Sequence, residues 1–416
     1  MPLALRVRSD DPRTSAPTLR RDASPLRVVA VVVSCVVALV GSVGWTWHRR
    51  QVDIQVYLMG ARHLTSAHLY SLYLPGVHLP FTYPPFSTLF FWPLTWIPSG
   101  AAGVVWSLVN VTALVLVLAV TLLHVRPELR ANESRVPWMM VLLLLGPAVL
   151  IEPAMLGLSF GQINLVLLAL VVVDATTRVQ VAGRTLPRGI GIGLAAAIKL
   201  VPFIFVPFLL VTRQFRAALT ALVTAGLCTL AAFVVNPSAS AAFWTKYVND
   251  QSRIGTVTYV SNQSLEGALD RVTHHVWSPH SIEAVEVVAA LAGLALAWWA
   301  WRVSSTFLAV MVVGDAGLLV SPITWAHHMV WVVPVLAWLW WGRDRPASGR
   351  VWAIVVAALF YVAPMWILAH GPTFDTHERG VALVADNSFT VAAIGFVAAV
   401  AAILTLRRRR AATSPR

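Results

Sequence analysis

The chain contains few charged residues. They make up 12% of its 416 residues, whereas a soluble domain has about a quarter. Hydrophobic residues account for 58%, and the mean hydropathy is +0.73. This composition excludes an ordinary soluble domain and predicts an all-α polytopic membrane protein. The 18 tryptophans fit such a protein, because indole rings favour the membrane–water interface.

Cysteine is almost absent. Cys35 and Cys228 both fall within apolar runs, where they are read as small apolar residues. The sequence has no HExxH or CxxC pattern, so it offers no disulfide framework and no standard metal site. We expect no metal ion and no cofactor.

Acidic residues are also scarce, and 18 of them against 31 lysines and arginines give a net charge of +13. A basic chain can bind nucleic acid, but these arginines gather in the N-terminal arm, in the run Arg407–Arg410 and in short loops. That distribution is typical of cytoplasmic membrane loops, with anionic lipid headgroups as the counter-charge. We therefore expect membrane lipids, and no nucleic acid, as partners.

Apolar runs of membrane-spanning length recur along the chain. Twelve spans are predicted, near Leu26–Trp47, Pro84–Ile97, Ala101–His124, Pro137–Ile151, Gln162–Ala175, Gly189–Val211, Ala217–Val235, Ile282–Trp301, Ser305–Val320, His328–Trp341, Val351–His370 and Ser388–Leu406. The second is short, because 14 residues of helix span only about 21 Å. The first follows a basic arm without a convincing cleavage site, and we interpret it as a retained signal anchor.

The distribution of arginine predicts the sidedness. Both termini are expected in the cytoplasm, as a basic arm (1–26) and a basic tail (407–416) around a single transmembrane domain (27–406). The two largest polar segments, 48–83 and 236–281, then fall on the outer side of the plasma membrane.

Strict alternation of spans leaves one conflict. It puts 125–136 and 176–188 outside, although both segments carry several arginines. Both would move inside if 84–97 and 189–211 were re-entrant rather than crossing, and prolines in the second of these favour a break. The sequence leaves both topologies open.

Asp53 lies just beyond the first apolar run. It is either a solvated loop acid or an acid that takes a proton from a substrate at the membrane boundary. Tyr57, Arg62, His63 and Tyr70 follow at roughly helical spacing, which predicts a short helix along the membrane surface.

Cationic side chains also occur in unusual places. Lys199 lies within an apolar run, either snorkelling to an interface or serving as a cation for a buried phosphate. His327 and His328 are adjacent between two runs, and adjacent residues do not share a helix face, which disfavours a shared zinc ion. They are either an interfacial pair without a role or donors to a phosphate.

Polar and aromatic residues flank several spans. Gln162 and Asn164 open one run, either as helix caps or as ligands for a hydroxyl-rich molecule. Tyr83 precedes two prolines, in either an aromatic belt or a groove for a sugar or an isoprenoid tail. Asn262 and Gln263 lie in the second large outer segment, with Arg253 before them.

These motifs resemble a known family, the polyprenyl-phosphate-mannose-dependent α-1,2-mannosyltransferases of the GT-C superfamily. The resemblance runs from Val52 to about Pro334. Its motifs are Val52-Asp53-Ile54-Gln55-Val56-Tyr57, Leu79-Pro80-Phe81-Thr82-Tyr83-Pro84-Pro85-Phe86, Ile151-Glu152-Pro153, Phe160-Gly161-Gln162-Ile163-Asn164, Ile198-Lys199-Leu200, Asn262-Gln263-Ser264 and Ser321-Pro322-Ile323 through Trp325 and His327-His328. The chain departs from the family at Phe160, where Tyr is frequent, and at Ser159, where an acid is frequent.

The resemblance implies a GT-C fold with membrane-parallel helices in the first outer loop and an outward-facing active site. It implies a β-linked polyprenyl-phosphate-mannose donor, a phosphatidylinositol mannoside acceptor and an inverting displacement. Asp53 matches the family's acid, and we assign it as the general base. We assign donor-phosphate contacts to His327, His328, Lys199 and Arg253, and sugar or acceptor contacts to Tyr57, Tyr83, Gln162, Asn164, Asn262 and Gln263.

Two rival functions remain at this stage. A sister enzyme on the same scaffold would build the α-1,2-mannose branches of lipomannan, or transfer arabinose from polyprenyl-phosphate-arabinose. A transporter of lipid-linked sugars would use Lys199, Glu152 and Asp315 as a relay within the membrane. The chain shows no internal repeat, which disfavours the transporter.

Overall fold

The computed structural model describes residues 4–6, 25–49, 51–130, 137–274, 276–367 and 379–413. Most of the predicted basic arm lies outside the described residues, as do the last residues of the predicted basic tail.

The described chain is almost entirely helical. The α-helices of its first half are α1 (Pro25–Arg49), α2 (Val52–Arg62), α3 (Phe86–Phe91), α4 (Ser99–Val125), α5 (Trp138–Leu150), α6 (Glu152–Phe160), α7 (Asn164–Thr176), α8 (Ile190–Ile198) and α9 (Phe205–Val211). Those of its second half are α10 (Phe215–Val235), α11 (Pro237–Ala242), α12 (Leu265–Thr273), α13 (Pro279–Val303), α14 (Thr306–Leu319), α15 (Val332–Trp341), α16 (Gly349–Val362), α17 (Val381–Asp386) and α18 (Ser388–Thr413).

Short helical turns and strands connect these helices. The turns are η1 (Leu69–Ser71), η2 (Trp92–Trp96), η3 (Pro127–Arg130), η4 (Val201–Ile204), η5 (Phe243–Tyr247), η6 (Gln251–Arg253), η7 (Ala326–Trp331) and η8 (Pro364–Trp366). Strands β1 (Ala4–Arg6), β4 (Arg178–Val181) and β5 (Arg184–Thr185) form one small antiparallel sheet, and β2 (Tyr73–Leu74) pairs with β3 (Leu79–Pro80).

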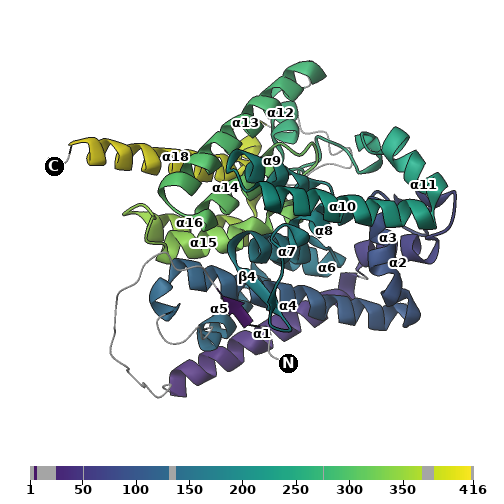
Figure 1. The fold of residues 1–416 in the computed structure, drawn as a ribbon, viewed down its shortest axis with the longest axis horizontal. Helices are drawn as coiled ribbons and strands as arrows, with labels where there is room; N and C mark the ends of the chain where they lie inside the picture. Colours follow the sequence, from purple (N-terminus) through teal and green to yellow (C-terminus); the bar gives the residue numbers. More distant parts are fainter. Residues whose placement is uncertain are drawn as a thin grey trace.

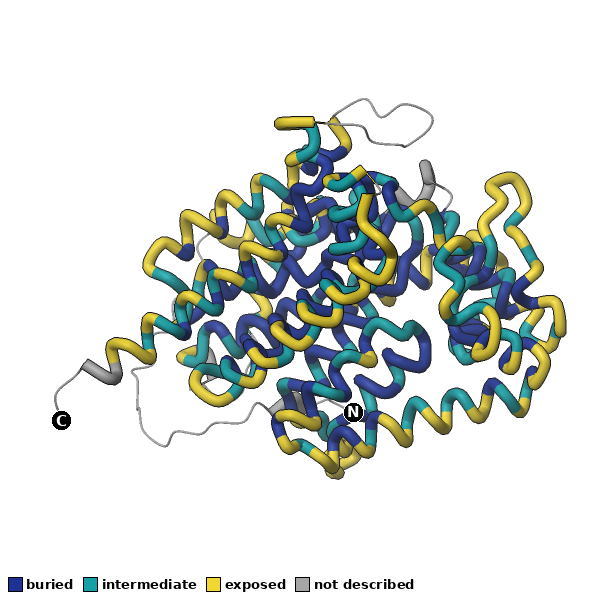
Figure 2. The backbone as a smooth tube through the Cα atoms, turned by 90° about the horizontal axis from the view of Figure 1, so that it is seen from above, coloured by how far each residue is buried: buried dark blue, intermediate teal, exposed yellow. Residues whose placement is uncertain are grey.

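Helix α14 lies at the centre of the bundle. Apart from Asp315 it is apolar along most of its length, and every residue from Phe307 to Leu319 is buried, as expected of a helix surrounded by other helices. Figure 2 shows this buried interior enclosed by helices with exposed outer faces. In Figure 1, α2, α3 and α11 gather at the right-hand end, whereas the C-terminal end of α18 projects at the left.

Five described helices are long and apolar enough to cross a membrane, namely Ser99–Val125, Phe215–Val235, Pro279–Val303, Gly349–Trp366 and Ser388–Arg410. A sixth crossing is added if α5 and α6, which meet at a bend of 74°, count as one span. Four further apolar helices have 10–17 residues. The protein is therefore a multi-pass helical membrane protein.

Several of the twelve predicted spans are not single helices, and two of these lie next to the candidate site. The segment 84–97 folds into the short elements α3 and η2, and 189–211 breaks into α8, η4 and α9. The second break follows from Pro202, whose ring would clash with the carbonyl of Ile198 if α8 continued. Lys199 consequently adopts an extended conformation directly after α8 (φ −146°, ψ 131°).

The broken segment 189–211 turns back on itself. Gly189 lies against Ala217 and Ala221, and Gly193 lies against Ala221 and Thr224, so α8 and α10 run parallel and begin at the same end. The chain between them must therefore return to that end through η4 and α9. This geometry agrees with the re-entrant alternative for this segment.

Arginine-rich connections meet at shared ends of the bundle. Strand β1, which precedes α1, pairs with β4 between α7 and α8, so the N-terminal arm and the connection 177–189 share one side. Asp344 likewise accepts hydrogen bonds from Ser304 (2.5 Å) and Arg407 (2.9 Å). These contacts join the α13–α14 and α15–α16 connections to the C-terminal helix.

Candidate active site

The start of α2 is fixed by contacts from three other segments. Gln51 adopts a left-handed conformation (φ 43°), and its buried side-chain amide donates to Ser107 of α4 (2.8 Å) and to the carbonyl of Leu158 in α6 (3.3 Å). Gly161 ends α6 at φ 72°, and a Cβ there would lie 2.9 Å from the side chain of Ile54. Glycine at 161 therefore supplies both the turn and the close approach of α2.

Asp53 is held in the first turn of α2 by Gln162. The Gln162 amide donates to Asp53 Oδ2 at 2.7 Å, and its carbonyl oxygen accepts from the hydroxyl of Tyr57 at 2.9 Å. The Tyr83 hydroxyl lies 2.8 Å from that of Tyr57 and 3.3 Å from Gln162 Oε1. Four predicted site residues thus form one hydrogen-bonded group, in which Gln162 orients the carboxylate.

Burial raises the pKa of Asp53 to about 6, against the lowering effects of the Gln162 hydrogen bond and of the positive charge on Lys199. A carboxylate with this pKa is ionised at neutral pH and more basic than a solvated aspartate. It therefore suits proton abstraction near neutrality.

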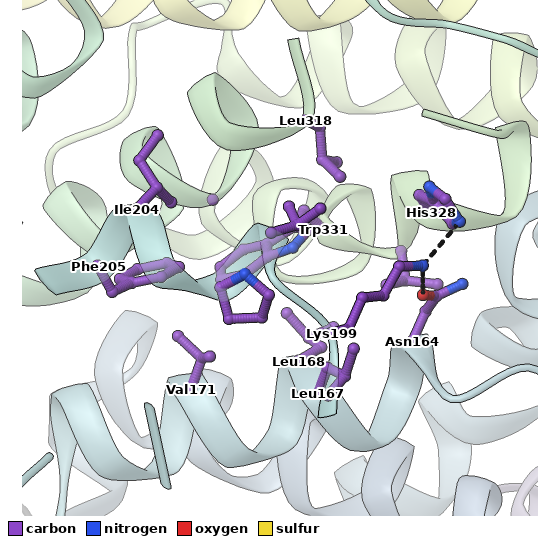
Figure 3. A pocket seen from close by; sticks show the side chains of 14 residues that line it. Asn164, Leu167, Leu168, Val171, Lys199, Ile204, Phe205, Leu318, His328 and Trp331 are labelled. Atoms are coloured by element: carbon purple, nitrogen blue, oxygen red, sulfur yellow. Dashed lines mark hydrogen bonds between the residues drawn. The ribbon is translucent and has the colours of Figure 1, made fainter. Parts of the chain in front are cut away.

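Lys199 connects this group to His328, and Figure 3 shows its hydrogen bonds to Asn164 and His328. Its Nζ atom lies 3.1 Å from Asn164 Oδ1 and 2.9 Å from His328 Nε2, and 5.5 Å from the centre of the Tyr83 ring. The break after α8 is what turns this lysine, from the middle of an apolar run, toward polar partners. Asn164 also donates to the carbonyl of His327 (3.0 Å), which ties α7 to η7.

The two histidines are both buried but have different surroundings. His328 Nδ1 accepts the main-chain N–H of Trp325 at 3.2 Å, so the neutral ring carries its proton on Nε2 and donates it to the Lys199 amine, or to an anion that takes the place of this contact. Both ring nitrogens of His327 are buried without a hydrogen-bond partner among the described residues, and its ring packs edge-on against Phe160. Such groups are unusual in protein interiors and suit an anionic ligand.

Arg253 is not in direct contact with this cluster. Its guanidinium donates to the carbonyl of Tyr70 and lies 4.6 Å from the centre of the Tyr247 ring. Tyr70 in turn donates to the carbonyl of Tyr83 at 2.8 Å. Tyr70 therefore lies between Arg253 and Tyr83, and we assign Arg253 no phosphate contact.

Asn262 and Gln263 pair with Thr324 and Trp325, just before the two histidines, but their predicted sugar contacts do not fit their surroundings. Both are completely buried. The Asn262 side chain bonds four main-chain groups, those of Val257, Pro322, Ser264 and Thr324. Gln263 bonds main-chain groups of Val260, Asp386, Phe389 and Thr390. Their amides are therefore committed to joining distant loops, and we remove both from the candidate site.

Asp53 sets an expectation for the pH dependence of turnover. Because the base must be ionised, kcat/KM should fall as the pH drops through about 6. Gln162→Leu removes the N–H that lowers the Asp53 pKa, so the acidic limb of the profile should move to higher pH in that variant. Initial rates measured between pH 5 and 8 test both statements, and an unmoved limb in Gln162→Leu would contradict the assigned contact.

Among the described residues, no group of three or more His, Cys, Asp or Glu side chains lies close enough to hold a metal ion. The cluster instead offers one carboxylate, one amine and two imidazoles, with tyrosine hydroxyls and amides between them. The carboxylate suits a reaction step that needs a proton acceptor, and the amine and imidazoles suit stabilisation of a negative charge that develops on a leaving group.

Comparison with known proteins gives a consistent result. The sequence profile of Glycosyltransferase family 87 matches residues 81–322. The chain is 36% identical over 317 residues, 71% of its length and 72% of the relative's, to the "polyprenol-phosphate-mannose-dependent alpha-(1-2)-phosphatidylinositol mannoside mannosyltransferase" of Mycobacterium tuberculosis. The protein of the same name from Mycolicibacterium smegmatis is 36% identical over 324 residues, 71% of each chain.

A third relative covers almost the whole chain. It is the "polyprenol-phosphate-mannose-dependent alpha-(1-2)-phosphatidylinositol pentamannoside mannosyltransferase" of Mycobacterium tuberculosis, 30% identical over 433 residues, with 98% of this chain and 96% of the relative covered. No solved structure matches. The family profile spans more than half of the chain, from just before Tyr83 to just before the histidine pair, and the chain belongs to glycosyltransferase family 87.

Proposed function

We propose that this glycosyltransferase moves mannose from polyprenyl-phosphate-mannose to a phosphatidylinositol mannoside and forms an α-1,2 bond. The observation that carries the proposal is the arrangement of one buried carboxylate, Asp53, joined through Gln162 and two tyrosines to Lys199 and His328. The printed names of the relatives support the donor, the linkage and the class of acceptor.

Asp53 is the base in this proposal. Its carboxylate takes the proton of the acceptor hydroxyl as that oxygen bonds to the anomeric carbon of mannose. A donor linked through a β-phosphate, which the family resemblance implies, gives an α product in a single displacement with inversion. One carboxylate suffices, because the phosphodiester leaves without protonation, unlike the two-carboxylate arrangement of glycoside hydrolysis.

Lys199, His327 and His328 hold the leaving group. As the bond from carbon to phosphate oxygen breaks, its electron pair goes to the polyprenyl phosphate, which becomes a dianion. Lys199 Nζ and His328 Nε2 lie 2.9 Å apart, so an anion bound beside them can accept hydrogen bonds from the lysine ammonium and from Nε2–H. Donors fixed before the reaction stabilise developing charge without reorganisation.

The rival functions fit the contacts less well. A proton relay would need Lys199 near Glu152 or Asp315, but the partners of Lys199 are Asn164, His328 and the Tyr83 ring, and Glu152 bonds Trp366. A sister enzyme using polyprenyl-phosphate-arabinose or building lipomannan branches keeps the same fold and base, and it differs only in its donor and acceptor.

We further propose the GT-C fold in the plasma membrane, with the active site on the outer side and both termini in the cytoplasm. If the segments 84–97 and 189–211 both turn back, the twelve predicted spans are reduced by two to ten crossings. An even number keeps the termini on one side. The two segments that turn back also place the arginine-rich connections 125–136 and 176–188 on the cytoplasmic side. This removes the conflict between strict alternation of spans and the positions of the arginines.

Labelling of single cysteines tests this sidedness. In a background with Cys35 and Cys228 replaced by alanine, we expect a membrane-impermeant maleimide to modify His280→Cys in intact cells, and to modify Ala182→Cys only after the membrane is opened. Both positions are exposed. Labelling of Ala182→Cys in intact cells would reverse the proposed orientation.

The activity itself is tested with purified protein in lipid nanodiscs. Polyprenyl-phosphate-mannose and polyprenyl-phosphate-arabinose are offered separately, each with a phosphatidylinositol mannoside, and products are analysed by mass spectrometry and NMR. We expect transfer of mannose alone, through an α-1,2 bond and without any ion gradient. Transfer of arabinose alone would identify the sister enzyme, and absence of both products would contradict the proposal.

A further inference from the structure

We propose that Arg271, a buried arginine on α12, is a positioning residue that fixes His328 beside Lys199. The inference rests on the proposed function, because it takes His328 to be a hydrogen-bond donor to the leaving phosphate. The effect of Arg271 passes through Asn262 and through the turn that leads into η7. Each contact along this path is described in turn below.

The guanidinium of Arg271 joins three separate segments of the chain. The residue is only 1% exposed. Its Nη1 donates to the carbonyl of Tyr259 at 3.2 Å, and its Nη2 donates to the carbonyl of Asn262 at 2.8 Å. Nε and Nη2 also donate to Asn387 Oδ1, at 3.1 Å and 2.8 Å. The planar fork of an arginine suits this role, because its N–H groups point in several fixed directions at once.

Arg271 keeps its positive charge in this environment. Burial lowers its pKa to about 10, and the negative charges of Asp386 and Asp270 oppose that lowering. The group is therefore protonated at neutral pH. Because Asp386 and Asn387 lie directly before α18, both the charge and the hydrogen bonds of Arg271 hold the start of that helix.

Helix α12 brings the guanidinium to Asn262. The helix begins after Ser264, whose hydroxyl accepts the N–H of Gly267 at 3.0 Å. Gly267 lies four residues before Arg271, on the same face of the helix. A Cβ at position 267 would lie 2.8 Å from the side-chain nitrogen of Asn262. This face of α12 therefore packs directly against Asn262.

Asn262 and its neighbour fix the turn before the two histidines. Asn262 pairs with Trp325 in an antiparallel bridge, and its Oδ1 accepts the N–H of Thr324 at 2.8 Å. The main-chain N–H of Gln263 donates to the Thr324 carbonyl at 2.6 Å. The Asn262 amide also donates to the carbonyl of Pro322 at 3.1 Å. The main chain of 322–325 therefore follows the position of Asn262.

The same turn orients the ring of His328. The main-chain N–H of Trp325 donates to His328 Nδ1 at 3.2 Å, and the main-chain N–H of His328 donates to the Trp325 carbonyl at 2.7 Å. The first of these bonds leaves the ring proton on Nε2, which lies 2.9 Å from Lys199 Nζ (Figure 3). A shift of Trp325 would change both where the ring lies and which nitrogen donates. Arg271 is thereby connected to the proposed phosphate contact.

Arg271→Met tests this connection, because it removes the fork and keeps an unbranched side chain. We expect kcat for mannose transfer to fall by roughly 10- to 100-fold, since a displacement of about 1 Å caused far from the chemistry has effects up to that size. The KM for the donor should change little. Steady-state kinetics in nanodiscs, with polyprenyl-phosphate-mannose and a phosphatidylinositol mannoside, measure both constants.

A double-mutant cycle separates positioning from general damage. In a His328→Ala background, Arg271→Met should cause no further loss of kcat, because the group that it positions is already gone. A smaller fraction of folded enzyme would instead lower the rate by the same factor in either background. In a Gln162→Leu background the two losses should multiply in full, because Gln162 acts on Asp53 rather than on the phosphate.

Matched variants complete the design. Arg302→Met makes the same exchange on α13, at an exposed arginine that lies 5.6 Å from the centre of the Trp298 ring, and it should keep the kcat of the wild type. If Arg271→Met fails to fold, as judged by thermal unfolding, Arg271→Lys enters the same cycle. It keeps the charge but replaces the fork by one nitrogen, so it should lower kcat in the same direction, again only when His328 is present.

The outcomes are distinct. A loss that disappears in the His328→Ala background supports the positioning role. An equal loss in both backgrounds, or no loss in Arg271→Met, overturns it while leaving the mannosyltransferase activity standing. A wild-type kcat in His328→Ala also overturns it, because His328 would then not hold the phosphate. A wild-type protein that transfers no mannose refutes the proposed function itself, and the role of Arg271 with it.

Discussion

Asp53→Asn should lower kcat by about 10²- to 10⁴-fold, the usual contribution of a positioned general base. The side chain keeps its shape, and its amide oxygen still accepts the Gln162 N–H that holds Asp53 at 2.7 Å. What is lost is the ability to accept a proton from the acceptor hydroxyl. Initial rates with radiolabelled polyprenyl-phosphate-mannose in nanodiscs measure the effect.

Donor binding and stability provide the controls for this variant. Asp53→Asn should bind the donor as the wild type does, because the cations that hold the phosphate are unchanged. Asp250→Asn removes an acid whose side chain, among the described residues, accepts from the neighbouring Ser252, and it should retain full activity. A rate near that of the wild type in Asp53→Asn would refute the base assignment and leave the protein without an identified catalytic acid or base.

Local sequence patterns predicted several features of the site correctly. The helical spacing after Asp53 predicted a short helix, and α2 is found at Val52–Arg62. The prolines after Lys199 predicted a break, and the helix ends immediately before that lysine. These features depend on a few consecutive residues, whose backbone preferences act before any tertiary contact forms.

Other features depend on contacts between distant segments and were not predictable in this way. Gln51, whose amide fixes α2 to α4 and α6, gave no signal beyond its position next to Asp53. Asn262 and Gln263 had the residue types expected of sugar ligands, but their amides bond main-chain groups far along the chain. An amide serves equally well in either role, so residue type alone could not distinguish them.

The number of membrane crossings also could not be predicted from local sequence patterns. Hydropathy identifies apolar segments, but it does not reveal whether a segment crosses the membrane or turns back. For 189–211 the answer comes from glycines that let α8 pack closely and in parallel against α10. The re-entrant path also explains how a lysine inside an apolar run reaches the polar cluster. The position of Lys199 beside Asn164 and His328 is therefore a consequence of the break after α8.

Lys199→Met should lower kcat by roughly 10²- to 10³-fold, the size of effect seen when one preorganised donor to a developing oxyanion is removed. Methionine has nearly the same length and shape as lysine but carries no charge. The loss should appear mainly in kcat, because negative charge on the phosphate increases as the sugar departs. Steady-state kinetics with varied donor concentration separate the effects on kcat and KM.

The chain offers a close control for this substitution, because Lys199 and Lys246 are its only lysines. Lys246 lies on η5, over the ring of Tyr247, and Lys246→Met should leave kcat unchanged. His328→Ala, which removes the N–H beside Lys199, should reduce kcat less than additively when combined with Lys199→Met, because the two donors act on one phosphate. Fully additive losses would show that they act on different groups, and wild-type turnover in Lys199→Met would place the leaving phosphate elsewhere.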